Sequence, residues 1–342
     1  MKEYQVSDLI GNEVLAKPVY LENGNIILEI GTVLKAGYKE SLISLNVNKI
    51  FIEDSYEKYE DPNFYFKRNE FKEFIEELRK IISHHIYKEN QRLRKLEELA
   101  ENIVNIFENI EEKRVVDIRD RTSDLYEHSI YTTLFVLMLG KEYHFCHERM
   151  RNAALGCLLH DLGHQYLSVN YENWNEMNLV PLKLFELKRH TILGYTAVEM
   201  EEWIPEISKN MILSHHEKLD GSGYPLKQRK YELECQMIQI CDSFDCAVAG
   251  IGCKKQSICE ALNMIVDSEK YVRNMALLLK EKIGIFPTGS LVRLNNQKDA
   301  IVISQTENPS APIVLYNMEF DEGEPVPRNL NYLKNIEIVG KL

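Results

Sequence analysis

The chain has 342 residues, of which 44% are hydrophobic, and a formal net charge of -12. This length predicts two or three domains, and the acidic balance argues against DNA or RNA polymers as general partners, because these bind clustered Lys and Arg. A small anionic ligand is compatible with this charge if bound metal ions supply positive charge. No apolar run approaches the roughly 18 to 20 residues that span a bilayer, and no signal-peptide pattern opens the sequence. We therefore expect a cytoplasmic protein without a membrane span.

The seven cysteines form no CxxC pair, and their odd number argues against a disulfide framework. Most of them are expected to be small buried residues.

Residues 1–55 are predicted to form a small β-rich module, in which Asn23-Gly24 between two strand-like runs indicates a hairpin. Residues 56–115 are predicted to be a helical linker, since residues 66–115 lack Gly and Pro and carry apolar residues at helical spacing. Two interpretations of these helices remain open, a homodimer seam through 66–115 or packing on the neighbouring domain, because heptads are not sustained.

Residues 116–283 are predicted to form a helical domain, since their apolar residues recur with a period near 3.6. Residues 284–342 alternate apolar and polar residues between Asn, Gly and Pro turns, which predicts a small C-terminal β-module. The expected fold class is therefore mainly α, with small β-rich modules at both ends.

The helical domain holds a set of imidazoles and carboxylates that is typical of a metal centre. Neutral imidazole and carboxylate suit divalent transition metals, and a carboxylate can bridge two ions. A single histidine is more often a hydrogen-bonded core residue, but several contexts in one helical segment favour metal binding. An apolar run precedes His160-Asp161, so this pair is expected to be buried, where it would be costly without partners. The candidate positions are His128, His160, Asp161, His190, His215, His216 and Asp242.

Four segments follow one another along the helical domain: LHDLG at 159–163, LKRHTILG at 187–194, HHEKLDGSGYP at 215–225 and QICDSFDC at 239–246. In this order they resemble the HD-GYP family. The first resembles its HD motif, the third its GYP motif, and the other two its supporting segments. The resemblance covers about half of the chain. It implies an HD-type helical bundle around two or three divalent ions, most often Fe or Mn, with Ni, Co or Zn as alternatives. The seven positions above would be the ligands, with Asp161 bridging.

Asp124 lies four residues before His128, where some members of the family hold a third metal ion. Residues four apart share one face of a helix, so both side chains could reach one ion. The alternative is that Asp124 is a helix N-cap, which the sequence RTSDLYEH also favours.

The resemblance also implies a phosphodiesterase that hydrolyses cyclic di-GMP by metal activation of water. In the GYP loop, Gly221 and Gly223 would allow a tight turn near a ligand, Tyr224 offers a stacking face, and Pro225 stiffens the exit. An ordinary DGSG turn is the alternative, but the adjacent histidine pair favours a functional loop.

The expected phosphate contacts depart from the family pattern. His164 stands where the family usually has a catalytic Lys, and it can donate a hydrogen bond or a proton but carries full charge only at lower pH. Gln236 replaces an expected Arg, and 247–256 differ from the usual basic and aromatic stretch, although Lys254 and Lys255 could restore some charge. A binding module with weak catalysis and a phosphohydrolase for another nucleotide are therefore retained as alternatives.

Overall fold

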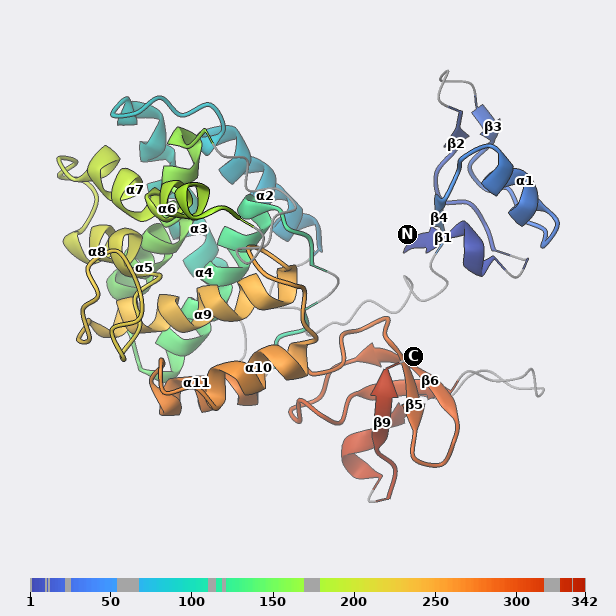
Figure 1. The fold of residues 1–342 in the computed structure, drawn as a ribbon. Coiled ribbons are helices and arrows are strands. Elements are labelled where there is room, and N and C mark those ends of the chain that lie inside the picture. The colour runs from blue at the N-terminus through green and yellow to red at the C-terminus, as the bar shows by residue number, and fades with distance from the viewer. Residues whose placement is uncertain are drawn as a thin grey trace. The chain divides into compact units, whose positions relative to one another are not determined.

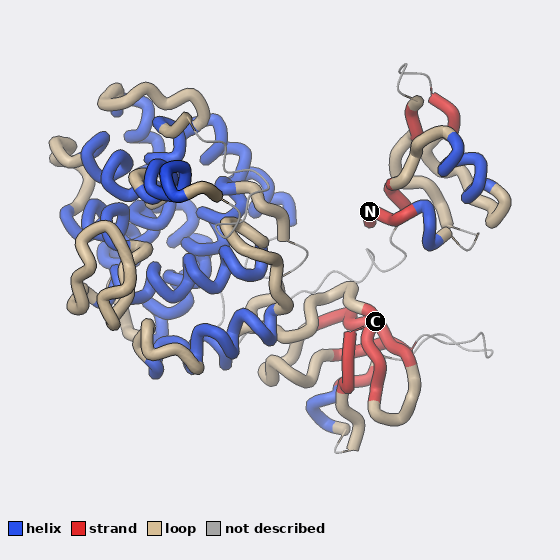
Figure 2. The backbone as a smooth tube through the Cα atoms, in the orientation of Figure 1, coloured by secondary structure: helices blue, strands red, loops and turns tan. Residues whose placement is uncertain are grey.

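The computed structural model describes residues 2–9, 11, 13–21, 26–53, 68–109, 115–118, 121–168, 179–316, 327–333 and 335–341. The chain divides into two compact units, Met1–Glu60 and Asp61–Leu342. It is mainly helical, with strands near both ends, which confirms the predicted class (Figure 2). The boundaries predicted at residues 55, 115 and 283 stay predictions. Within the described ranges, no helix has both the length and the apolar character needed to cross a membrane.

The first unit is built from two antiparallel strand pairs around a small apolar core. Its core side chains include Val6, Leu15, Leu34 and Ile50. The predicted Asn23-Gly24 turn lies outside the described residues, but the strands on either side of it pair antiparallel, as in a hairpin. The elements are β1 (Lys2–Gln5) paired with β4 (Lys49–Ile52), β2 (Val19–Tyr20) paired with β3 (Ile26–Leu28), η1 (Val6–Asp8) and α1 (Tyr38–Ser44).

The helices of the predicted linker are part of the core of the second unit. They are α2 (Arg68–Ile82), η2 (Asn90–Arg94) and α3 (Lys95–Glu108). Their apolar residues, such as Leu78, Leu99 and Phe107, are buried in the same core as the helices that follow. The structure therefore agrees with packing on the neighbouring domain, while a homodimer through these helices stays a prediction.

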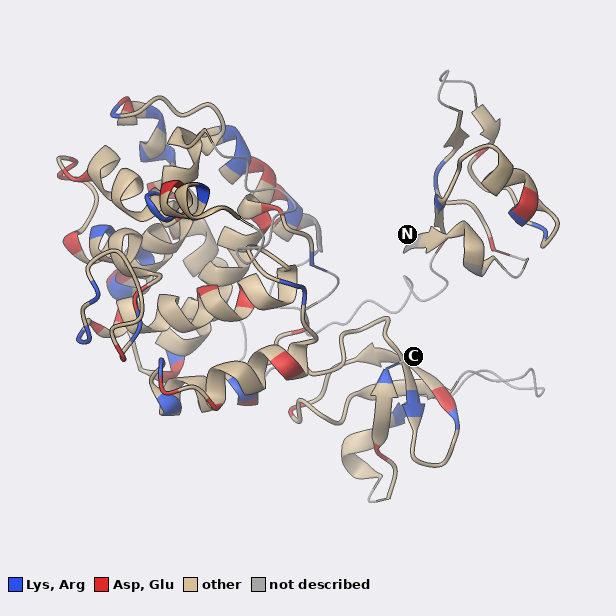
Figure 3. Ribbon diagram, viewed as in Figure 1, with Lys and Arg blue, Asp and Glu red and all other residues tan. Residues whose placement is uncertain are grey.

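Three helices form the centre of the bundle (Figure 1). α4 (Leu125–Glu142) packs on both α5 (His147–Leu159) and α9 (Leu233–Ala249). α4 is buried around its whole circumference from His128 to Gly140, as expected for a helix that is apolar on every side. Lys, Arg, Asp and Glu are interspersed on the outer helices (Figure 3). The surrounding elements are η3 (Leu162–Tyr166), α6 (Pro181–Lys188), α7 (His190–Val198), α8 (Glu206–Ser214), α10 (Ile258–Val266) and α11 (Arg273–Lys282).

The C-terminal strands form an antiparallel sheet in the order β8-β7-β6-β5-β9. One face of this sheet has its own small core, with Val292, Val302 and Val314 fully buried. The elements are β5 (Leu291–Leu294), β6 (Asp299–Ser304), β7 (Ile313–Tyr316), β8 (Arg328–Asn329), η5 (Leu330–Tyr332) and β9 (Ile338–Lys341).

Gly163 allows η3 to approach α7 at backbone distance. A Cβ atom at this position would lie 1.9 Å from the carbonyl oxygen of His190 and 2.8 Å from the backbone nitrogen of Gly194. Only glycine fits this contact, because the backbone of a packed helix cannot move aside as a side chain can. The contact brings the residues just before η3 next to the start of α7.

We expect Gly163→Ala to lower the free energy of unfolding by about 3 kcal/mol or more, because the added methyl group overpacks two backbone segments. Urea unfolding followed by circular dichroism measures this change. Gly340→Ala is the matched control, since a Cβ atom there meets nothing within 4 Å. Equal stability of the two variants would contradict the assigned packing.

Candidate metal centre

The seven residues singled out in the sequence converge in one cluster within the helical bundle. They come from the first turns of α4, the ends of α5 and α8, the start of α7 and the middle of α9. His128, His160, and His215 are fully buried, and His190 and Asp242 are each 2% exposed. Segments that are far apart in the sequence therefore contribute polar side chains to one buried cluster.

Asp161 lies between two groups of histidines. Its Oδ2 atom is 3.4 Å from His160 Nε2 and 3.9 Å from His128 Nε2. Its Oδ1 atom is 3.6 Å from His190 Nε2 and 3.7 Å from His215 Nε2. One carboxylate thus presents a different oxygen to each group, which is the arrangement of a bridging ligand between two ions.

Asp242 also faces both groups. Its Oδ1 atom is 3.2 Å from His128 Nε2, and its Oδ2 atom is 3.3 Å from His216 Nδ1. Ligand atoms within 4.8 Å of one another include those of His128, His160 and Asp161, and those of His190, His215 and His216. Both sets could hold a metal ion.

The hydrogen bonds of the histidines fix which ring nitrogen can bind a cation. In His160, His190 and His215, Nδ1 lies 2.6 to 2.9 Å from the backbone carbonyl three residues earlier. A carbonyl only accepts, so Nδ1 is inferred to donate, and the neutral ring then carries its lone pair on Nε2. Histidines that bind metals have this pattern, with the other ring nitrogen donating to a carbonyl or carboxylate.

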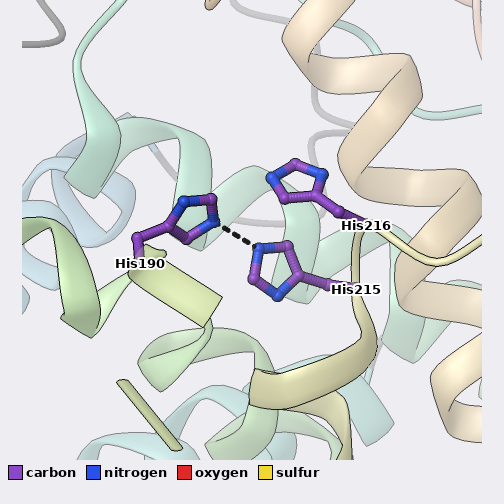
Figure 4. A group of neighbouring side chains, drawn as sticks. All are labelled: His190, His215 and His216. Atoms are coloured by element: carbon purple, nitrogen blue, oxygen red, sulfur yellow. Dashed lines mark hydrogen bonds between the residues drawn. The ribbon is translucent and has the colours of Figure 1, made fainter. Parts of the chain in front are cut away.

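His190 Nε2 and His215 Nε2 are nevertheless only 3.0 Å apart (Figure 4). Two neutral acceptor atoms that face each other at this distance, in a buried site, require a proton or a cation between them. The two Nε2 lone pairs can both bind a divalent metal ion, so the residues present fit such an ion.

His128 is held by a buried carboxylate instead of a carbonyl. Its Nδ1 atom lies 2.7 Å from Asp245 Oδ2, and Asp245 also accepts hydrogen bonds from the Arg121 guanidinium. The guanidinium carbon in turn lies 3.6 Å from the centre of the Tyr131 ring. This chain of contacts orients the His128 ring and balances the charge of a buried carboxylate.

The roles of Arg121 and Asp245 were not predicted from the sequence. Asp245 follows Asp242 by one helical turn, so helical spacing could have indicated it. No local signal marks Arg121, which is 124 residues away from its partner.

The surroundings of the site shift the pKa values of its residues in the direction that suits metal binding. Burial, and then the neighbouring histidines, lower the pKa of His190 and of His215 well below the usual value, so both rings are neutral. Burial alone would raise the pKa of Asp161, but nearby His160 and His164 hold it well below its usual value. Neutral imidazoles next to an ionised carboxylate are the protonation states that divalent ions bind.

His128 differs from the other histidines. Burial acts to lower its pKa, but Cys246, Asp242 and Asp245 raise it well above the usual value. The same carboxylates would attract a cation to Nε2, and a bound ion would displace any proton from that atom.

Asp124 occupies the N-cap of α4. Its Oδ1 atom accepts hydrogen bonds from the backbone of Tyr126 and Glu127, each at 2.9 Å, and its Oδ2 atom accepts from Arg79 at 2.7 Å. Among the described residues, the groups of close ligand atoms do not include Asp124. The geometry therefore agrees with the N-cap interpretation, and a role in binding a third ion stays a prediction.

His164 lies at the edge of the histidine cluster. Its ring stacks on that of His190, with the centroids 4.2 Å apart and the planes at 14°. Its Nε2 atom is 3.5 Å from Asp161 Oδ1. His164 is therefore next to the same carboxylate oxygen as His190.

The GYP loop folds directly onto the His215-His216 turn. A Cβ atom on Gly223 would lie 2.5 Å from Glu217 Cα, so glycine is required for this approach, and Gly221 adopts a φ of +78°. Buried Glu217 accepts hydrogen bonds from the backbone of Leu226 and Lys227, and these bonds fix the position of the loop just after Pro225. The Tyr224 ring consequently lies 4.8 Å from the His216 ring.

A cavity of about 60 Å³ borders the cluster of histidines and aspartates. Side chains of Asp161, His164 and Tyr224 line it, together with Ile251 and Gly252 from the segment after α9. Lys254 of that segment is exposed. Gln236, in place of the expected Arg, donates a hydrogen bond to the Tyr231 carbonyl.

Lys188 is a further candidate that the sequence did not single out. It ends α6, two residues before His190, and its Nζ atom lies 5.0 Å from the centre of the Tyr224 ring. It places a positive charge beside the GYP loop. Its proximity to a ligand histidine in LKRHTILG was the only available signal.

Comparisons with known proteins agree with this architecture. Residues 125–247 match the HD domain family. The cyclic di-GMP phosphodiesterase PA4108 of Pseudomonas aeruginosa is 26% identical over 194 residues, which cover 55% of this chain and 47% of that protein. The cyclic di-GMP phosphodiesterase PdeB of Borreliella burgdorferi is 24% identical over 208 residues, which cover 59% and 54%. The chain thus spans about half the length of these relatives.

A solved structure supports the fold. Bd1817, an HDG"Y"P protein from Bdellovibrio bacteriovorus, is similar with a TM-score of 0.51 and 18% sequence identity, over 81% of this chain and 97% of that one. The predicted HD-type helical bundle is confirmed.

We expect Asp161→Ala to remove most of the bound metal, because one carboxylate faces both groups of histidines. Metal affinity should fall by more than the roughly 10- to 100-fold loss that follows removal of a residue that only hydrogen-bonds to a ligand. Elemental analysis of purified protein measures the metal content, and His160→Ala should show a comparable loss. Asp267→Ala, at the exposed end of α10, is the control and should retain the metal. A full metal complement in Asp161→Ala would rule out the bridging role.

Proposed function

We propose that this chain, whose residues 125–247 match the HD domain family, is a metal-dependent phosphodiesterase of the HD-GYP type that hydrolyses cyclic di-GMP. The proposal rests above all on the facing acceptor atoms of buried histidines, which are 3.0 Å apart at His190 and His215. The substrate is supported by the two relatives named above, both cyclic di-GMP phosphodiesterases.

We assign each ligand to one of two ions. His128, His160, Asp242 and Asp161 Oδ2 would hold the first ion. His190, His215, His216 and Asp161 Oδ1 would hold the second. Bound divalent ions of this kind lower the pKa of water and neutralise phosphate charge. Fe and Mn are the ions that the family resemblance favours.

The other residues around the cavity have roles in binding and proton transfer. Hydrolysis joins a water oxygen to phosphorus, breaks the bond from phosphorus to one ribose oxygen, and delivers a proton to that leaving oxygen. His164 lines the cavity and is the candidate donor of this proton. Tyr224 offers a face on which a base can stack. Lys254 stays a predicted phosphate contact.

A binding role with weak catalysis is the second candidate function. Ligand pockets commonly enclose about 300 to 1,000 Å³, whereas the cavity here encloses about 60 Å³. The cavity as observed is therefore too small to enclose a whole dinucleotide, so part of such a ligand would lie outside it. The replacement of expected phosphate-binding residues by His164 and Gln236 also favours the binding role.

We expect protein loaded with Mn or Fe under anaerobic conditions to convert cyclic di-GMP into the linear dinucleotide or GMP. Chromatography of the nucleotides over hours measures turnover, with Asp161→Ala as the inactive control. Calorimetric binding without product would select the binding role. Turnover of a different nucleotide in a substrate panel, with cyclic di-GMP left intact, would replace the substrate assignment.

We also expect Lys188→Gln to raise KM for cyclic di-GMP about tenfold with a smaller change in kcat, because an ion pair or charged hydrogen bond to phosphate is worth about 1.5 to 3 kcal/mol. Lys183→Gln is the matched control, since Lys183 is exposed on the same helix. Steady-state kinetics of both variants provide the measurement. Equal KM values for the two variants would show that Lys188 makes no phosphate contact.

A further inference from the structure

One cysteine lies among the candidate ligands. Cys246 follows Asp242 by four residues on α9, so both side chains lie on the same face of the helix. Its Sγ atom is 3.7 Å from Asp242 Oδ1 and 4.0 Å from His128 Nε2. It also lines the cavity above the centre. Cys157, Cys235 and Cys241, in contrast, are buried in the hydrophobic core.

We propose that the thiolate of Cys246 is an additional ligand of the ion held by His128 and Asp242. This inference rests on the metal centre proposed above. It adds a sulfur donor that the family resemblance did not assign.

The distances fit a shared coordination sphere. Nitrogen and oxygen ligands lie about 2.0 to 2.2 Å from zinc-like ions and thiolate sulfur about 2.3 Å, so that donor atoms around one ion are separated by roughly 3 to 4 Å. His128 Nε2, Asp242 Oδ1 and Cys246 Sγ are separated by 3.2, 3.7 and 4.0 Å. All three separations fall in this range, and the three atoms form one of the groups of close ligand atoms.

The environment supplies an independent reason for a cation at this point. His160 Nε2, an acceptor by its hydrogen-bond pattern, lies 3.2 Å from His128 Nε2. Asp242 is 2% exposed and carries its charge in the same space. Three polar side chains besides the cysteine are therefore buried and directed toward one another.

Ligation requires the thiol to lose its proton. When a divalent ion binds, the S–H bond breaks, the proton leaves to solvent, and a sulfur–metal bond forms. A thiolate is a soft ligand, so it shifts preference toward Zn or Fe and away from Mn.

The absorption spectrum of cobalt-substituted protein tests the proposal without measuring activity. A thiolate bound to Co(II) gives a near-ultraviolet charge-transfer band that histidine and carboxylate ligands do not give. The full chain is loaded with Co(II), bound cobalt is quantified by elemental analysis, and spectra are compared for wild type, Cys246→Ala and Cys246→Ser. Cys259→Ser is the control, because Cys259 is exposed on α10.

We expect wild type and Cys259→Ser to show the band and both Cys246 variants to bind cobalt without it. The serine variant nearly preserves side-chain size, so it keeps the test valid if the alanine variant folds poorly. The ratio of Zn to Mn affinity should also fall about tenfold or more in the Cys246 variants, since the soft ligand is lost.

The possible failures separate the two proposals. Wild-type protein that binds cobalt without a thiolate band, or a band that persists in both Cys246 variants, overturns the role of Cys246 and leaves the metal centre standing. Wild-type protein that binds no cobalt, zinc or manganese overturns the metal centre, and the role of Cys246 with it.

Discussion

The Nδ1 atoms of three buried histidines donate to backbone carbonyls, and the rest of the site depends on this interaction. His160 and His215 directly follow α5 and α8, and His190 follows α6 by two residues. The last carbonyls of a helix lack partners within the helix, so each ring satisfies one of them. The same hydrogen bond that completes a helix end leaves Nε2 as an acceptor and fixes its direction.

The site concentrates negative charge in a buried region, and the surrounding residues compensate only part of it. Asp161 and Asp242 bring negative charge into a buried region, and Arg121 balances Asp245 behind His128. Removing one member of such a network leaves an unpaired buried charge, which is more costly than the network itself. In the described part of the cluster, no Lys or Arg balances the carboxylates that face the cavity in this way, so a bound divalent cation would supply the missing positive charge.

The candidate metal ligands and the residues proposed to contact the substrate lie in different parts of the fold. The candidate ligands are attached to helices, or to residues within one or two positions of a helix end, and are held by core packing. The rim of the cavity instead consists of the GYP loop, the end of α6 and the segment after α9. Loops tolerate substitution more readily than packed helices. The candidate ligands can therefore stay intact while the segment after α9 departs from the family pattern.

Much of this architecture was predictable from the sequence, because it depends on local patterns. Apolar residues with a period near 3.6 indicated the helices, the histidines and aspartates indicated the donor set, and HHEKLDGSGYP indicated the loop beside it. The tertiary structure decided what those patterns do not encode. It placed different oxygens of Asp161 toward the two histidine groups, and it showed Asp124 as an N-cap paired with Arg79. It also joined Arg121 to Asp245 and set Lys188 beside Tyr224. Helical spacing relates residues one or two turns apart, whereas these contacts join separate elements and exist only after the core has packed.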